Sequence, residues 1–120
     1  MPAPVYLLTL CTHRRRFVLR GDSRDIAWRA LTDVLQRRCP GLSVDCAVVM
    51  PDRLYAIVRL PQPVSLSPLV QAYKAATTPA IKTAAAVDRV WERGFERREI
   101  RDEAELIATR ALIKSYDRAT

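Results

Sequence analysis

The order of hydrophobic patterns along the chain predicts an α+β protein with a ferredoxin-like (split βαβ) fold. Strand-like and helix-like segments follow one another in the order β-α-β-β-α-β-α. The first six form the split βαβ arrangement, which gives a four-stranded antiparallel sheet with helices, and the seventh is an appended C-terminal helix. The chain has 120 residues, a length that suits one hydrophobic core. We therefore expect a single domain over residues 1–120.

The first three elements are assigned from their periodicity. Residues 5–12 are β-branched and aliphatic, as in a buried strand. Asp22 or Ser23 is expected to cap a helix that runs to about Arg38. Its apolar stripe consists of Ile26, Ala30, Leu31, Val34 and Leu35. A second strand over residues 42–50 is expected to place alternate residues on one face, namely Leu42, Val44, Cys46, Val48 and Met50.

A third strand follows the Pro51-Asp52 turn, from about Arg53 to Leu60. Alternation gives it one apolar face and one mixed face. The apolar face carries Leu54, Ala56, Val58 and Leu60; the mixed face carries Arg53, Tyr55, Ile57 and Arg59.

The second half of the chain predicts a helix, a strand and a helix. Ser67 is expected to cap the first helix, with Pro68 in its first turn, and Pro79 is expected to kink or split it. Residues 89–100 can supply the fourth strand, with Gly94 as a bulge. The last helix starts at Asp102, with acidic residues in its first turn.

Composition indicates a polyanionic partner. The net charge is +7 and the pI about 9.9, which favours nucleic acid. The three cysteines form no CxxC pair, so neither a disulfide framework nor a zinc site is expected. Trp28 and Trp91 lie beside apolar neighbours and are expected to anchor the core.

The chain contains no apolar run of roughly 18 residues, and its apolar-then-basic start is the reverse of a secretory signal. We expect no membrane partner and a cytoplasmic location, with nucleoid association if the protein binds DNA.

Four stretches resemble motifs of single-tyrosine transposases of the HUH superfamily, particularly the REP-associated branch. LLTLCTHRR resembles the family's FITFCTHNR, and CAVVMPDRLYAIV resembles YVVMPNHVHLLV. SLSPLVQAYKAATT resembles the family's second helix, and VWERGFERREIRDEAEL resembles VWQRGFYDHVIRDEEEL. The similarity spans nearly the whole chain in the same order.

The resemblance implies a site whose reactive groups are replaced. In the family, two histidines hold a divalent cation and a tyrosine on the last helix attacks a DNA phosphate. Arg53 and Tyr55 stand at the two histidine positions, and Leu112 stands at the tyrosine. Arginine repels a cation and neutral tyrosine is a poor ligand for Mg²⁺ or Mn²⁺. We therefore expect no cofactor, no metal site and no intact catalytic residue.

An active enzyme is the first alternative. Tyr116 lies one turn after Leu112 and is a candidate substitute nucleophile, with Asp52 or His13 as a substitute ligand for Mg²⁺ or Mn²⁺. A tyrosine that simply packs its ring on the sheet is the competing interpretation of Tyr116. The second alternative is a protein-interaction module without a DNA role, and a homodimer also remains open.

Binding of DNA, single-stranded or hairpin, is the expected function. Arginines would contact phosphates and Tyr55 would stack on a base. The candidate contact residues are Arg14, Arg15, Arg16, Arg53, Tyr55, Arg59, Lys74, Arg93, Arg97 and Arg98.

Overall fold

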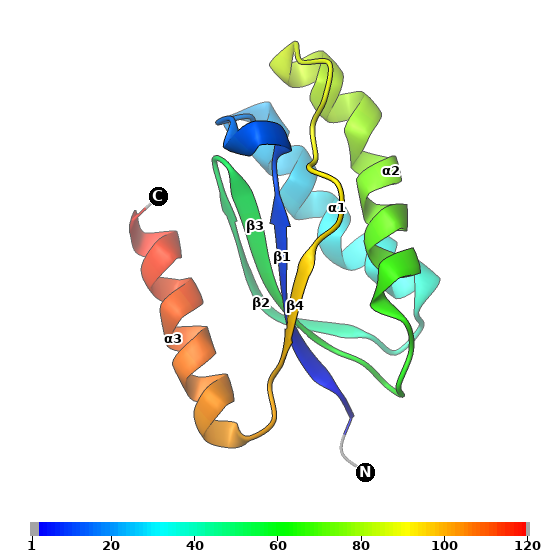
Figure 1. Ribbon diagram of the computed structural model, residues 1–120, viewed down its shortest axis with the longest axis vertical. Coiled ribbons are helices and arrows are strands. Elements are labelled where there is room, and N and C mark those ends of the chain that lie inside the picture. Colours follow the sequence, from blue (N-terminus) through cyan, green and yellow to red (C-terminus); the bar gives the residue numbers. More distant parts are fainter. Residues whose placement is uncertain (1–2, 120) are drawn as a thin grey trace.

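A computed structural model describes residues 3–119 and confirms the predicted fold class (Figure 1). The strands are β1 (Val5–Cys11), β2 (Ser43–Met50), β3 (Arg53–Arg59) and β4 (Glu96–Glu99). The helices are α1 (Asp22–Arg38), α2 (Leu66–Ala85) and α3 (Glu103–Ala119), with a short 3-10 turn, η1 (His13–Arg15). The strands form one antiparallel sheet in the order β2-β3-β1-β4. This is the order of a split βαβ fold, with β1 and β3 in the centre.

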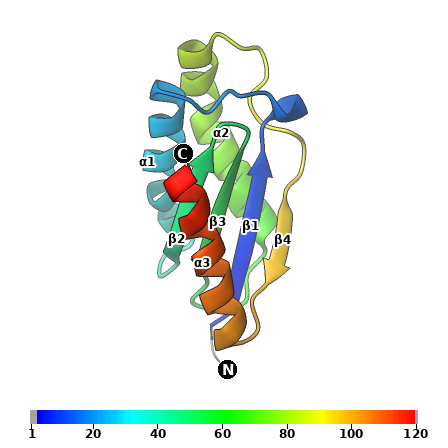
Figure 2. The same ribbon diagram turned by 90° about the vertical axis from the view of Figure 1, so that its left-hand side faces the viewer.

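The sheet lies between two helical layers. Helices α1 and α2 cover one face and α3 covers the other (Figures 1 and 2). The predicted alternation of β3 is confirmed, because Leu54 packs toward α1 and α2 while Ile57 packs toward α3. The larger core lies under α1 and α2, and a smaller one lies under α3, where it includes Val48, Leu106 and Ile113.

A bulge in β2 makes the predicted facing of that strand wrong. Val44 pairs with Val58 but Cys46 pairs with Ile57, so Asp45 is one extra residue opposite β3. An extra residue reverses the alternation beyond it. Val44 therefore packs toward α1 and α2, as does Leu42, whereas Cys46, Val48 and Met50 pack toward α3.

The helix starts differ from the predicted ones. Gly21, with a φ of +55°, precedes α1, and Asp22 is already its first residue. Ser65, not Ser67, precedes α2. The earlier start is explained by Leu66, which is buried one turn before Leu69 and Val70 and so begins the apolar face of that helix.

Pro79 does not split α2, which runs without a break through it. Thr77 and Ile81 are both fully buried on either side of the proline. Packing on both sides therefore keeps the helix continuous, although the proline lacks an N–H for the preceding turn.

The fourth strand is shorter than predicted. Trp91 forms an isolated bridge with Thr12, and regular pairing resumes only where Glu96 faces Thr9. Residues 92–95 thus lie opposite only two residues of β1, which is a wider gap than a bulge. Gly94 lies inside this gap with a φ of +79°, a value that glycine adopts without strain.

Helix α3 is fixed at its start and near its middle. Asp102 Oδ1 accepts from the Glu105 N–H at 2.8 Å, and Glu105 Oε2 accepts from the Arg101 N–H at 3.1 Å, which together cap the helix. Further along, the bulge residue Asp45 accepts from Arg110 Nε at 2.7 Å and lies 3.5 Å from the Arg59 guanidinium. The hydrogen bond from Arg110 lowers the pKa of Asp45.

Within residues 3–119, none of the helices combines the length and the apolar character that crossing a bilayer requires.

Replacing Asp45→Ala should loosen α3, because it removes the carboxylate that joins Arg110 to the sheet. We expect faster amide exchange in α3 and a lower urea midpoint. The matched control is Asp33→Ala, which removes an exposed pair with Arg37 on α1 (3.2 Å) and should change both readouts little.

The contribution of Asp45 to stability should depend on pH. The pKa of Asp45 is lower in the folded state than its ordinary 3.8, so its stabilisation is complete above roughly pH 5 and is lost as the pH falls through the lowered value. The difference in unfolding free energy between wild type and Asp45→Ala should therefore shrink in acid. A constant difference down to about pH 2 would contradict this origin.

Candidate nucleic-acid interface

Arg53, the first residue of β3, binds two neighbouring side chains. Its Nε and one terminal nitrogen donate to the two carboxylate oxygens of Asp52, at 3.2 and 3.0 Å. The other terminal nitrogen donates to the Tyr55 hydroxyl at 3.0 Å. The hydrogen bond from Arg53 lowers the pKa of Asp52, and Asp52 raises the pKa of Arg53. Such a bidentate pair has a defined geometry, so all three side chains are oriented together.

The residues around Arg53 do not fit a divalent cation. Its guanidinium stays protonated, and it already occupies both oxygens of Asp52. Mg²⁺ and Mn²⁺ require several oxygen ligands. Across residues 3–119, no three His, Cys, Asp or Glu side chains come together in a way that could hold a metal.

Tyr116, and not Leu112, is the residue of α3 that reaches Tyr55. The two tyrosine rings stack with centroids 5.4 Å apart and planes at 15°. Leu112 is 47% exposed, whereas Ile113 is buried against the sheet. The position that the resemblance assigns to the nucleophile thus turns to solvent, and the tyrosine one turn later packs its ring on the sheet.

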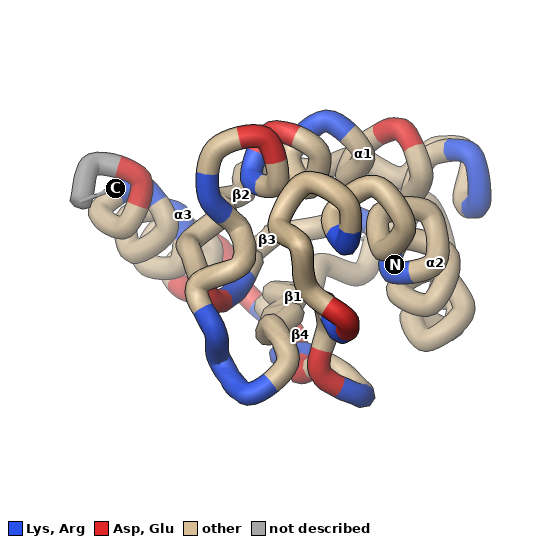
Figure 3. The backbone as a smooth tube through the Cα atoms, turned by 90° about the horizontal axis from the view of Figure 1, so that it is seen from above, with Lys and Arg blue, Asp and Glu red and all other residues tan. Residues whose placement is uncertain are grey.

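The loop over residues 13–19, which contains η1 and is called the η1 loop below, is basic and lies at the same end of the sheet as the β2–β3 turn; we call this end the basic end. Thr12, which is fully buried, joins the two: its N–H donates to the Asp52 carbonyl at 3.0 Å. Its hydroxyl lies 2.7 Å from the Arg16 carbonyl oxygen and 3.1 Å from that of Asp52. Seen from this end (Figure 3), Arg14–Arg16 form the longest basic run of the chain.

The loop divides its arginines between two places. The hydrogen bond from Arg53 is the main cause that lowers the pKa of Asp52, and the positive charge of Arg15 adds to it, so Arg15 lies near Asp52 on the Arg53 side of the sheet. Arg14 instead lines a groove next to α2. Both arginines have a positive φ, of 55° and 54° respectively, a conformation that side chains other than glycine rarely adopt.

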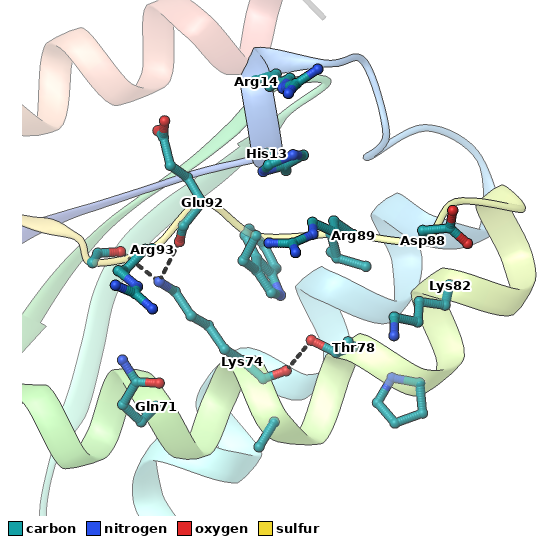
Figure 4. A pocket seen from close by; sticks show the side chains of 15 residues that line it. His13, Arg14, Gln71, Lys74, Thr78, Lys82, Asp88, Arg89, Glu92 and Arg93 are labelled. Atoms are coloured by element: carbon teal, nitrogen blue, oxygen red, sulfur yellow. Dashed lines mark hydrogen bonds between the residues drawn. The ribbon is translucent and has the colours of Figure 1, made fainter.

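The groove is an open cavity of about 1060 Å³ between α2 and residues 88–94 (Figure 4). Its lining carries more positive than negative charge. The basic lining residues are Arg14, Lys74, Lys82, Arg89 and Arg93; the acidic ones are Asp88 and Glu92. His13 also lines this groove, so the only histidine is directed away from the Arg53 side and does not contribute to a metal site there.

Lys74 has a structural contact that the sequence did not indicate. It is only 8% exposed, and its Nζ donates to the carbonyl oxygens of Glu92 (2.9 Å) and Gly94 (Figure 4). Burial lowers its pKa. The lysine thus holds the irregular segment that interrupts the β1–β4 ladder, and one of its three N–H groups is left for a ligand.

The remaining predicted contact residues lie apart from this end or on different faces. Arg59 is at the opposite end of β3 from Arg53 and pairs with Asp45. Arg98 donates to the Thr109 hydroxyl of α3 at 3.1 Å, so it faces α3, and alternation places exposed Arg97 on the other face. The predicted set therefore forms no single surface: the η1 loop, Arg53 and the groove share one end, and Arg59 does not.

The expectation for the tryptophans is half correct. Trp91 packs against Tyr73 and its indole N–H donates to the Thr77 hydroxyl at 3.0 Å, as a core anchor does. Trp28 is 51% exposed, because it lies one residue, about 100°, beyond the buried Ala27 on α1. The prediction also missed exposed Phe17, although its position after three arginines was visible in the sequence.

Together these features define a ferredoxin-like domain with a basic end and a C-terminal helix stacked on the second face of the sheet. Searches with the chain match no protein-family model and no curated protein.

Solved structures share this fold. A REP-associated tyrosine transposase bound to a REP hairpin is 19% identical, with a TM-score of 0.70, over 91% of this chain and 63% of that one. A presumed transposase from Deinococcus radiodurans R1 is 21% identical, with a TM-score of 0.72, over 99% and 92% of the two chains. The chain thus shares the fold of these two proteins, and spans less than two thirds of the hairpin-bound one.

Replacing Thr12→Val should weaken the attachment of the η1 loop to the β2–β3 turn, because it removes the hydroxyl bonds and keeps the side-chain shape and the backbone bonds. We expect a loss of about 1–2 kcal/mol in unfolding free energy, typical of a buried hydrogen-bonding hydroxyl, and faster amide exchange over residues 13–19. Thr83→Val is the control, since its exposed hydroxyl bonds only to Pro79 within α2. Equal effects of the two substitutions would contradict the role of Thr12.

Proposed function

We propose that this protein binds DNA, single-stranded or hairpin, through its basic end and does not cleave it. The observation that carries the proposal is the network of Arg53 with Asp52 and Tyr55, at the positions where the resemblance implies two metal-binding histidines. The positive charge of the Arg53 guanidinium would thus do at this place what a divalent metal ion does in the family that the chain resembles.

Arg53 retains the capacity to bind a phosphate. A guanidinium has five N–H donors. Three of them donate to Asp52 and Tyr55, which leaves two donors for a phosphate. Arg15 adds a second charge on the same side. Phosphate contacts of this kind supply affinity and fix orientation without reading sequence.

The groove extends the basic end around the η1 loop. Arg14 joins Lys82, Arg89 and Arg93 along its rim, and its volume of about 1060 Å³ is ample for a segment of nucleic-acid strand. A strand that crosses the η1 loop would meet positive charge on both sides. The hairpin bound by the structurally similar transposase makes a hairpin with a single-stranded extension the natural first ligand, and a DNA-bound protein would be nucleoid-associated.

A DNA-cleaving enzyme is the second candidate, and Tyr116 favours it. The stack on Tyr55 puts this tyrosine next to the Arg53 network, where a nucleophile would be needed. We rank this candidate lower because Asp52 is occupied by Arg53 and His13 lines the groove instead. A homodimer, or an interaction module built on exposed Trp28 beside edge strand β2, is a further proposal.

A combined binding and nicking assay separates these functions. Fluorescence anisotropy with a labelled hairpin should detect binding that weakens with salt, and denaturing gels with Mg²⁺ or Mn²⁺ should detect no nicked or protein-linked strand. A covalent adduct that disappears in Tyr116→Phe would replace the proposal by the enzyme. Absence of salt-sensitive binding would refute the DNA role.

The charge of the η1 loop should set the salt dependence. Arg14→Gln/Arg15→Gln removes two charges at the basic end, and Arg37→Gln/Arg38→Gln removes two exposed charges at the far end of α1. For a single strand, the first pair should reduce the slope of log affinity against log salt by about 1.4, since each phosphate contact contributes about 0.7. The control pair should leave the slope near the wild-type value; equal slopes in both variants would count against this surface.

A further inference from the structure

Phe17 is an exposed aromatic ring at the end of the basic loop. Its side chain is 67% exposed, and the residues that follow it, Val18 and Leu19, are buried in the main core. The other large hydrophobic residues exposed in the described part of the chain, Trp28, Ile107 and Leu112, lie on helices. Phe17 alone among these four directly follows a run of arginines, so its surroundings are cationic and not apolar.

The backbone on both sides of Phe17 is tightly fixed. On its N-terminal side, the Arg16 carbonyl accepts from the Thr12 hydroxyl at 2.7 Å and from the Val18 N–H at 2.8 Å. On its C-terminal side, the Leu19 N–H donates to the Pro51 carbonyl at 2.9 Å. The ring thus projects from an anchored loop, and its exposure does not come from a loose segment.

The loop also stores unfavourable backbone geometry. Arg14 and Arg15 both have a positive φ, where glycine would be free of strain. Strained conformations persist only where the surrounding structure enforces them, and they gather at binding sites. The three arginine side chains and the phenylalanine ring remain exposed in this conformation.

This combination suits one kind of ligand. A flat apolar ring stacks on an unpaired nucleobase, and the adjacent cations bind the phosphates of the same strand. A protein partner with an acidic surface would use the arginines but gains little from a solitary ring. A paired duplex offers phosphates while its base faces are hidden, so it would use the arginines and not the ring.

We propose that Phe17 is a stacking platform for one unpaired base of a single-stranded nucleic acid whose phosphates contact Arg14–Arg16. The inference rests on the proposed DNA binding and adds the part of the ligand that this end recognises. It places base contact on the η1 loop, in addition to the Tyr55 position that the resemblance suggested.

The test compares Phe17→Leu, which keeps apolar volume but removes the π face, with Phe17→Trp, which keeps it. Trp28→Leu is the matched control for an exposed aromatic residue away from the arginines. Each is titrated with a single-stranded oligonucleotide, its blunt duplex and the RNA of the same sequence. Phe17→Leu should weaken single-strand binding about tenfold, within the range of one base stack, with an unchanged salt slope. Phe17→Trp should retain affinity, and duplex binding should not change.

A 2-aminopurine base in the oligonucleotide gives a direct reading of stacking: its fluorescence should change on binding to wild type and not to Phe17→Leu. If wild type binds the single strand and Phe17→Leu binds it equally, stacking is overturned while DNA binding stands. If wild type binds no oligonucleotide, both proposals fail.

Loss of binding to anionic phospholipid vesicles in Phe17→Leu, with oligonucleotide binding unchanged, would assign the ring to a membrane surface instead. The RNA arm shows whether the platform distinguishes the sugar.

Discussion

The hydrogen bonds of Thr12 help to fix how the basic loop and the β2–β3 turn lie relative to each other. This buried residue follows the central strand β1 and contacts the carbonyl oxygens of both Asp52 and Arg16. It therefore fixes the β2–β3 turn, which carries Arg53, against the loop that carries the three consecutive arginines. The charges of the basic end come from segments about forty residues apart in sequence, and Thr12 joins them together with the backbone hydrogen bond from Leu19 to Pro51.

At the β2–β3 turn, a charged side chain stands where the resemblance implies a metal ligand. A metal site needs electron-pair donors around an empty centre, whereas Arg53 fills that centre with its own cation and satisfies the nearest carboxylate. Both carboxylate oxygens of Asp52 and the hydroxyl of Tyr55 are thereby hydrogen-bonded to Arg53. Tyr55 is oriented by Arg53 on one side and by the ring of Tyr116 on the other, so these contacts join the sheet to the last helix.

Regular alternation and element order could be predicted from the sequence, and interruptions could not. The β3 faces were predicted correctly because its residues alternate without a break. In β2 the extra residue Asp45 reversed the facing beyond it, and nothing local distinguishes this aspartate from a regular strand residue. Its hydrogen-bond partner, Arg110, lies 65 residues away in the sequence, a separation that no short sequence pattern detects.

The candidate site shows the same limit. Arg53 and Tyr55 were found because the motif is contiguous in sequence. The stack of Tyr116 on Tyr55 depends on the rotation of α3, which the buried Thr109 and Ile113 decide together. Lys74 was predicted to contact a ligand, and the sequence did not indicate that it also holds two backbone carbonyls, because that role depends on the irregular path of a distant segment.

That irregular path has an evolutionary consequence. Residues 92–95 lie between two fixed points, the Trp91 bridge and the start of β4, and Lys74 holds the carbonyl oxygens of Glu92 and Gly94. Apart from these contacts, the number of residues there is not dictated by strand register. Insertions or deletions in this stretch would alter the wall of the neighbouring groove and leave the sheet as it is. Length variation at one short segment is thus a route by which proteins with this fold can change the shape of this groove, provided that the buried Lys74 keeps carbonyl partners.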